Sequence, residues 1–179
     1  MGNSEFCIDE RLIRQAKALV DDLRRREITV VTAESCTGGL IAAALSHGPG
    51  ASECLHGGFV VYTKAHKTMA LGVPPALLDV KGTVNAEVAS ALASGALGRS
   101  PADVALAVTG VLGPEADEDG NPPGEIYFAV AQRGRPTEVR MEHFAADDPH
   151  EVRHAVVVWA LTLLKNSVAS GNRSGRNPV

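Results

Sequence analysis

Two stretches of mostly apolar residues constrain this 179-residue chain more than any other feature. They read ITVVTA at 28–33 and ADVALAVTG at 102–110, and both are rich in small and β-branched residues. Strands of this kind, without apolar–polar alternation, are typical of a sheet that is covered on both faces. Segments with helical character lie between them, so the sequence predicts an α/β domain.

Helical periodicity is clearest at 10–26, where the apolar residues share one face and the charged residues lie on the other. The apolar set is Leu12, Ile13, Ala16, Leu19, Val20 and Leu23. Further helices are predicted at 37–47, 64–71, 85–98 and 149–165, with a helical piece inside 74–82. Asn85 is a candidate N-cap, and Pro149 lies near the start of the last helix.

A second strand is predicted at 54–63, and an antiparallel pair at 125–132 and 137–144. Helices alternate with strands, and the last two strands are adjacent in the chain. This order predicts a three-layer α/β/α domain with a mixed, mostly parallel sheet. We expect one domain over 1–166 and a flexible tail over 167–179, where the sequence is mostly polar.

Composition narrows the classes of function. The net charge of -4 argues against a general nucleic-acid binder, which would usually be basic. No apolar run is long enough to span a bilayer, and the first residues lack the apolar core of a signal peptide. Cys7, Cys36 and Cys54 have neither the number of a disulfide framework nor the spacing of a zinc site. We expect a cytoplasmic protein without a metal, a cofactor or a membrane partner.

The turn ESCTGG follows the first apolar strand and opens a predicted helix. This position lies at the sheet edge where ligands collect in open α/β folds. The N–H groups of Cys36, Thr37 and Gly38 would be unpaired donors for a phosphate or an oxyanion. Gly38 and Gly39 would let a ligand approach the backbone closely. Alternatively, Ser35 or Thr37 only caps the helix, which is the commoner role of such residues.

Two residues of this turn, Ser35 and Cys36, could act as a nucleophile. A thiol at a helix N-terminus has a lowered pKa, so Cys36 could be the nucleophile as well as Ser35. Adjacent side chains generally point apart, so only one of the two is expected to face the ligand. The residues alone do not choose between them.

The segment GGFVVYTKAHK offers candidate partners for the nucleophile: Tyr62, Lys64, His66 and Lys67. A desolvated lysine has a lowered pKa and can act as a general base, and a Ser–Lys pair is a known variant of the Ser–His arrangement. A solvated charge remains the commoner role for any single lysine, and a lone histidine is more often a surface residue.

A third polar turn follows the strand that ends in AVTG. Thr109 and Gly110 would border the same crevice as the ESCTGG turn, because the carboxyl ends of parallel strands share one sheet edge. An ordinary exit from strand to loop is the alternative, and by itself the more common one.

Taken together, TAESCTGGLIAAALS, GGFVVYTKAHKTMALGV, AVTGVLGP and GEIYFAV resemble the CinA C-terminal domain family. The resemblance covers residues 12–164 and looks like the stand-alone form, without the large N-terminal domain of full-length members. It implies a nicotinamide-nucleotide amidohydrolase, which converts nicotinamide mononucleotide to nicotinate mononucleotide and ammonia. Neither a metal nor a cofactor is implied.

The resemblance also assigns roles to residues. Ser35 matches the family nucleophile, Lys67 its activating base, and Tyr62 a tyrosine that orients the lysine or relays the proton. The ribose phosphate is expected to lie against glycine-rich turns. The implied substrate-binding residues are Cys36, Thr37, Gly38, Gly39, Gly58, Thr109 and Gly110.

Two other functions share this sequence pattern, namely an amidase for another small amide and a nucleotide-binding protein without activity. Four acidic residues in the loop 115–121 would repel a substrate phosphate if that loop lies near it. The small domain and its Ala-rich helices leave apolar faces, so we expect a homo-oligomer, most simply a dimer, that binds a small nucleotide and no nucleic acid.

Overall fold

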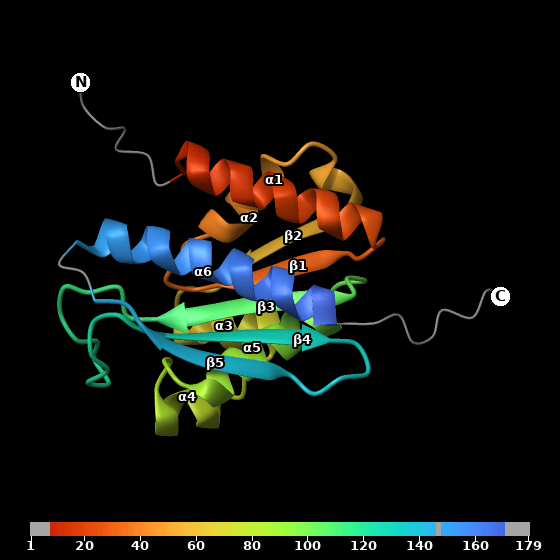
Figure 1. The fold of residues 1–179 in the computed structure, drawn as a ribbon. Helices are drawn as coiled ribbons and strands as arrows, with labels where there is room; N and C mark the ends of the chain where they lie inside the picture. The colour runs from red at the N-terminus through yellow and green to blue at the C-terminus, as the bar shows by residue number, and fades with distance from the viewer. Residues whose placement is uncertain (1–7, 146–147, 171–179) are drawn as a thin grey trace.

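The computed structural model describes residues 8–145 and 148–170, which form helices and strands in alternation (Figure 1). In chain order the elements are α1 (Glu10–Arg25), β1 (Val30–Glu34), α2 (Leu40–Ser46), the 3-10 helix η1 (Ala51–Glu53), β2 (Leu55–Val60), α3 (Lys64–Leu71), α4 (Pro75–Lys81), α5 (Ala86–Gly98), β3 (Val104–Gly110), β4 (Glu125–Gln132), β5 (Glu138–His143) and α6 (Pro149–Ser170).

The five strands form one sheet in the order β2-β1-β3-β4-β5. β1 pairs in parallel with both β2 and β3, whereas β4 pairs antiparallel with β3 and with β5. Four strands therefore run in one direction and β4 runs in the other. The predicted mixed sheet is confirmed. Its parallel part contains β1 and β3, the two strands that were predicted from their mostly apolar sequences.

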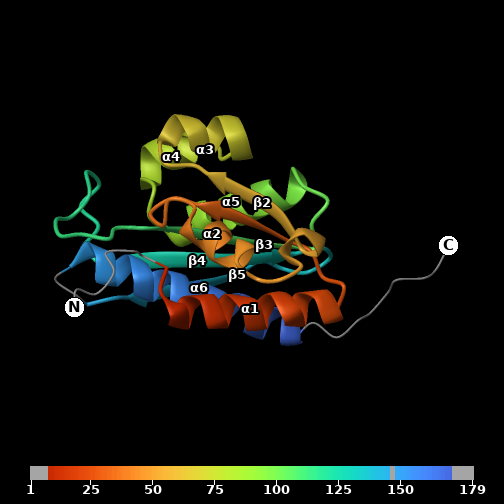
Figure 2. The ribbon, with the colours of Figure 1, turned by 90° about the horizontal axis from the view of Figure 1, so that it is seen from above.

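Helices cover both faces of the sheet, which confirms the predicted three layers. α2 and α6 pack on one face, and α1 lies across both of them. α5 packs on the other face against β1, β3, β4 and β5, with α3 and α4 beside it. Figure 2 shows α3 and α4 on one side of the sheet and α1 and α6 on the other.

Alternate residues of β3 explain why this strand lacks polar alternation. Leu106 and Val108 point into the core beneath α1, α2 and α6, while Ala105 and Ala107 point into the core beneath α5. All four are fully buried. A strand with a helical layer on each side needs apolar residues at every position, which is why the sequence pattern predicted it correctly.

Two predicted boundaries differ from the structure. The helix predicted from residue 37 begins at Leu40, because Gly38 and Gly39 have φ of 63° and 95° and hold the preceding residues in a turn. The last helix continues to Ser170, past the domain end predicted at 166. Ser167 and Val168 are buried, so the first residues of the predicted tail belong to the packed helix, and 171–179 lie outside the described residues.

Within the described part of the chain, no helix combines the length and the apolar composition that crossing a membrane requires.

Candidate active site

The polar turns predicted to meet at one sheet edge do lie there. β1 and β3 run in parallel, so the residues that follow them leave the sheet on the same side. Ser35 comes directly after β1, and its backbone N–H donates to the carbonyl oxygen of Val108 in β3. The loop after β3 and the start of α6 lie at this same edge (Figure 1).

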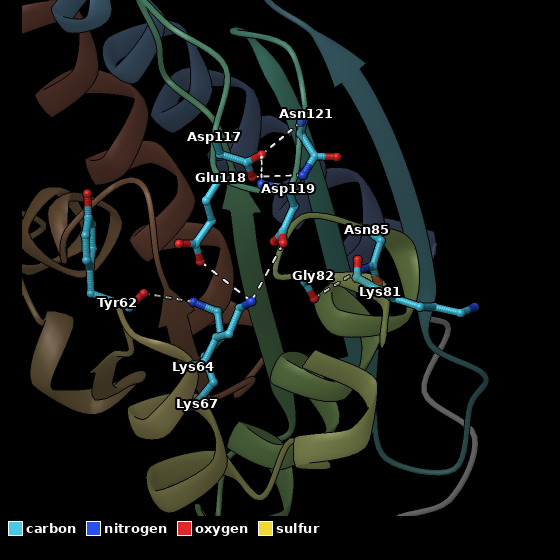
Figure 3. Close-up of polar contacts among 10 residues, drawn as sticks. All are labelled: Tyr62, Lys64, Lys67, Lys81, Gly82, Asn85, Asp117, Glu118, Asp119 and Asn121. Atoms are coloured by element: carbon cyan, nitrogen blue, oxygen red, sulfur yellow. Dashed lines mark hydrogen bonds and ion pairs between the residues drawn. The ribbon is translucent and has the colours of Figure 1, made fainter. Parts of the chain in front are cut away.

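The structure brings Ser35 and Lys67 into direct contact. The Nζ atom of Lys67 lies 2.9 Å from Ser35 Oγ, although the two residues are far apart in the sequence. The same Nζ donates to the backbone carbonyl oxygens of Val61 at 2.7 Å and Tyr62 at 3.3 Å. Figure 3 shows the contact with the Tyr62 carbonyl.

Local structure explains why Lys67 faces inward. Thr63 caps α3, since its hydroxyl oxygen accepts from the backbone N–H of His66. Lys67 lies one helical turn before Leu71, and both are on the buried face of this helix. Lys67 is 0% exposed, and Ser35 is only 8% exposed.

Burial changes the chemistry of this lysine. Removal of the ammonium from water lowers the pKa of Lys67 from 10.5 to about 8, because the charged form loses its hydration. A pKa in this range leaves a useful fraction of neutral amine near neutral pH, as a general base requires.

The two carbonyl oxygens also direct the lone pair of the neutral amine. Neutral Nζ carries two hydrogens, and the carbonyls of Val61 and Tyr62 are two acceptors for them. The lone pair is then left for the third neighbour, the hydroxyl of Ser35. This arrangement can take the serine proton as Oγ attacks an electrophile.

Cys36 lies in a different environment from Ser35. Its side chain belongs to the apolar core beneath α1, α2 and α6, and burial raises the pKa of its thiol to about 12. Such a thiol stays protonated at neutral pH. Ser35 contacts Lys67 and the Cys36 thiol does not, so the geometry favours the serine, while its role as nucleophile stays a prediction.

The other two candidate bases do not contact Ser35. His66 is exposed on α3. Lys64 lies between two acidic side chains of the loop after β3, at 3.6 Å from Glu118 and 3.7 Å from Asp119. Figure 3 shows these ion pairs next to Lys67. The acidic loop therefore packs beside the site, and part of its charge is neutralised by Lys64.

Tyr62 meets Lys67 through its backbone and not through its phenol group. The side chain is 73% exposed, and Figure 3 shows the ring pointing away from Lys67. The Tyr62 carbonyl is one acceptor of the Lys67 amine, and the role of this tyrosine in catalysis stays a prediction. Among the described residues, no hydrogen bond joins the phenol oxygen to Lys67.

Glu34 is a site residue that the sequence analysis missed. It is fully buried at the end of β1, and its carboxylate accepts four hydrogen bonds. The donors are Thr32 Oγ1, Thr37 Oγ1 and the backbone N–H groups of Ile41 and Ala42. Glu34 thus caps α2 from a distance and fixes the turn that follows Ser35. The sequence signal that could have identified Glu34 is a carboxylate at the end of an otherwise apolar strand.

The N–H groups of the turn differ in whether they have a backbone acceptor. Gly38 N–H donates to the Ser35 carbonyl at 3.1 Å, so the prediction that it is an open donor is wrong. Among the described residues, the N–H groups of Cys36, Thr37 and Gly39 have no backbone acceptor. These three remain available to a ligand.

Three predicted substrate-binding residues have packing contacts, and their role in binding stays a prediction. A side chain at Gly58 would collide with Thr32 and Ala42, so this glycine lets β2 lie close to its neighbours. Thr109 Oγ1 donates to the carbonyl oxygen of Thr83 at 2.8 Å and joins β3 to the segment before α5. Gly110 lies against Ile126 in the same way as Gly58 against its neighbours.

A cavity of about 340 Å³ opens over the turn that follows Ser35, and neither Ser35 nor Lys67 is among its lining residues. Its walls are the turn 36–39, Leu40 and Ala43 of α2, Tyr62, and Arg153 near the start of α6. It is large enough for a small ligand. In residues 8–145 and 148–170, no cluster of three or more His, Cys, Asp or Glu side chains could hold a metal ion.

The fold and the site together define a class of protein. It is an α/β protein in which a serine follows an inner strand of a mixed sheet and is hydrogen-bonded to a buried lysine, so that the two form a candidate Ser–Lys site. The model of the CinA C-terminal domain matches residues 13–168, and the chain belongs to this family.

Relatives and solved structures agree with this assignment. A relative from Symbiobacterium thermophilum is 46% identical over 134 residues, which are 75% of this chain and 31% of that protein. A CinA-like protein from Akkermansia muciniphila is 44% identical over 131 residues, or 73% of this chain and 32% of that protein. The chain therefore spans about a third of the length of these curated relatives.

Among solved structures, the competence damage-inducible protein A of Klebsiella pneumoniae is 34% identical, with a TM-score of 0.86 over 90% of this chain and 99% of that one. A competence/damage inducible protein of Agrobacterium tumefaciens is 35% identical, with a TM-score of 0.81 over 92% and 97%. The fold described above is thus that of the family.

Proposed function

We propose that this protein hydrolyses the carboxamide of nicotinamide mononucleotide and releases ammonia and nicotinate mononucleotide. The hydrogen bond between Ser35 Oγ and the buried amine of Lys67 carries this proposal. Membership of the CinA C-terminal domain family, which is associated with this amidohydrolase activity, supports the choice of substrate.

In the first half of the reaction, Ser35 Oγ attacks the amide carbonyl carbon and Lys67 takes the hydroxyl proton. The carbonyl oxygen becomes an oxyanion, for which the N–H groups of Cys36 and Thr37 are available donors. Lys67 then gives its proton to the amide nitrogen, ammonia leaves, and an ester between Ser35 and the acyl group remains.

In the second half, water attacks the ester, and neutral Lys67 takes the proton of this water. The tetrahedral intermediate collapses, Ser35 recovers its proton from Lys67, and the carboxylate product leaves. One lysine therefore acts as base and acid in both halves, which a pKa of about 8 permits.

Replacement of the nucleophile tests this mechanism. Ser35→Ala should reduce ammonia release from nicotinamide mononucleotide by about a thousandfold or more, because the covalent route is lost. Ser46→Ala is the matched control, since this serine is exposed at the end of α2 and its hydroxyl donates only to the backbone of Ala43. Wild-type turnover by Ser35→Ala would refute the mechanism, and release of ammonia only from other amides would refute the substrate.

A further inference from the structure

The Ser–Lys pair is almost closed off from solvent in this structure. Ser35 is 8% exposed and Lys67 is 0% exposed, and neither lines the cavity over the turn 36–39. An attacked carbon must come within about 3–3.5 Å of the serine oxygen before a bond can form. A ligand therefore reaches the pair only when a segment that covers it moves.

The loop 111–124, which joins β3 to β4, starts beside the serine. It continues β3, the strand whose Val108 carbonyl oxygen accepts the backbone N–H of Ser35 at 3.1 Å. The base of the loop is fixed, because the N–H of Val111 donates to the Glu125 carbonyl oxygen at 3.0 Å. Movement of this loop would thus begin beyond its base, next to Ser35.

The tip of the same loop lies on the helix that carries the lysine. Glu118 lies 3.6 Å and Asp119 lies 3.7 Å from the Nζ atom of Lys64. Lys64 is the first residue of α3, about one helical turn before Lys67. Figure 3 shows the loop tip beside the two lysines. The loop therefore reaches from one partner of the pair to the other, and we call its two ion pairs with Lys64 the latch.

The latch is a weak attachment. In the described part of the chain, residues 112–121 form no other hydrogen bond or ion pair with the rest of the protein. The side chains of Lys64 and Glu118 are 36% and 79% exposed. Exposed ion pairs of this kind contribute little to stability and are screened by salt. Segments with few buried contacts open at low cost in free energy.

The tip itself is held together from within. The Asp117 carboxylate accepts from the backbone N–H groups of Asp119 and Asn121, and from Asn121 Nδ2. These bonds do not involve the rest of the protein, so they persist when the latch breaks. The tip can therefore leave α3 as one unit.

We infer that the loop 111–124 is a gate over the Ser–Lys pair and that the latch holds this gate closed. Opening of the gate admits the reacting group of a ligand to Ser35 Oγ. Because a ligand binds only the open fraction of the molecules, the latch weakens apparent binding in proportion to that fraction. The inference rests on the proposed function in one respect, which is that Ser35 is the atom to be reached.

Two variants break the latch and change the net charge in opposite directions. Lys64→Met removes one positive charge, whereas the double variant Glu118→Gln/Asp119→Asn removes two negative charges. An effect of overall charge on a ligand or reagent has opposite signs in the two, whereas release of the loop has the same sign in both. Arg14→Met is the matched control, because Arg14 forms an exposed ion pair with Glu10 on α1.

Access to position 35 can be measured without catalysis. In a Ser35→Cys/Cys36→Ala background, alkylation of the thiol at position 35 by iodoacetamide is followed by mass spectrometry. Each latch variant should speed this alkylation by at least about threefold, because the rate follows the open fraction. The buried thiol of Cys54 should react at an unchanged rate.

Salt provides an independent check on the same thiol. A concentration of about 0.5 M should speed its alkylation in the protein with an intact latch and not in the latch variants, because salt screens the ion pairs. Equal alkylation rates in all proteins, or changes of opposite sign in the two latch variants, would overturn the gate.

Ammonia release from nicotinamide mononucleotide gives a second measurement in proteins that retain Ser35. Both latch variants should raise kcat/KM by about two- to tenfold, mainly through a lower KM, and Arg14→Met should match wild type. A fall in both latch variants would show that the closed loop is part of the site, and would overturn the gate. If wild type releases no ammonia, the proposed function fails, and alkylation at position 35 still decides whether the gate exists.

Discussion

At the scale of single residues, the amine of Lys67 is held by the main chain. The carbonyls of Val61 and Tyr62 are independent of the side chains at those positions, so the direction of the lone pair depends on backbone geometry. Burial supplies the lowered pKa, and neither contribution requires a second charged residue at Lys67.

The pKa of Lys67 predicts how activity depends on pH. Only the neutral amine can accept the Ser35 proton, so kcat/KM should rise with pH through an apparent pKa of about 8. The neutral fraction, and with it the rate, should increase by about tenfold between about pH 7 and about pH 9. Cys36→Ala should keep this inflection, because the buried thiol is protonated throughout this range. A flat or falling profile would contradict the role of Lys67 as base.

Replacement of Glu34 should reduce the stability of the protein far more than replacement of an acidic residue on the surface. Glu34→Ala leaves four donors without their acceptor, three of them in buried hydrogen bonds, which should lower the free energy of unfolding by about 3–5 kcal/mol in chemical denaturation. Glu53→Ala is the comparison, because Glu53 only forms an exposed ion pair with Arg24. A loss at Glu34 as small as that at Glu53 would show that the carboxylate does not hold the turn.

At the scale of elements, the position of Lys67 depends on how closely α3 lies to α5. Gly95 of α5 permits this approach, because a side chain there would collide with the Leu71 carbonyl at the end of α3. The contact is with backbone, so it cannot be relieved by a change of rotamer. The close packing of α3 against α5 therefore depends on this one glycine.

Gly95→Ala should displace α3 and move Lys67 away from Ser35. We expect stability to fall by about 1–3 kcal/mol and kcat to fall with it, because small displacements at a reacting pair are costly. Gly98→Ala on the same helix is the matched control, since a side chain there would meet no atom within 4 Å. Thermal denaturation and ammonia release measure both effects. Similar results for the two variants would argue against the close contact.

The elements themselves were largely predictable, because periodicity, caps and glycines act locally. Asn85 caps α5 as predicted, with its side chain accepting from Val88 N–H. The start of α2 was not predictable in this way, since its cap is Glu34, which precedes the helix by several residues. Helical spacing from Leu71 could have separated Lys67 from His66 but not from Lys64, because positions four and seven before a buried residue share its face.

At the scale of the whole molecule, the end of α6 connects the helical layer to the far strands of the sheet. Gln132 Nε2 donates to the Ser167 carbonyl, and Ser167 Oγ donates to Glu138. Val168 is buried in the core that also contains Phe128. Contacts of this kind join segments that are distant in sequence, so composition alone suggested a tail there.

Two truncations test this connection. A chain ending at Asn166 should be less stable by about 2–4 kcal/mol than one ending at Ser170, because it loses the burial of Val168 and two hydrogen bonds. Equilibrium unfolding of the two proteins measures the difference directly. Equal stabilities would mean that the fold ends at residue 166.

Tyr62 gives the backbone carbonyl that orients Lys67, and it presents a side chain to the cavity. These two contributions are made by different parts of one residue. We therefore expect substitutions of the ring to change ligand recognition while Lys67 keeps its orientation. Recognition at this position is thus expected to vary independently of the contact between Ser35 and Lys67.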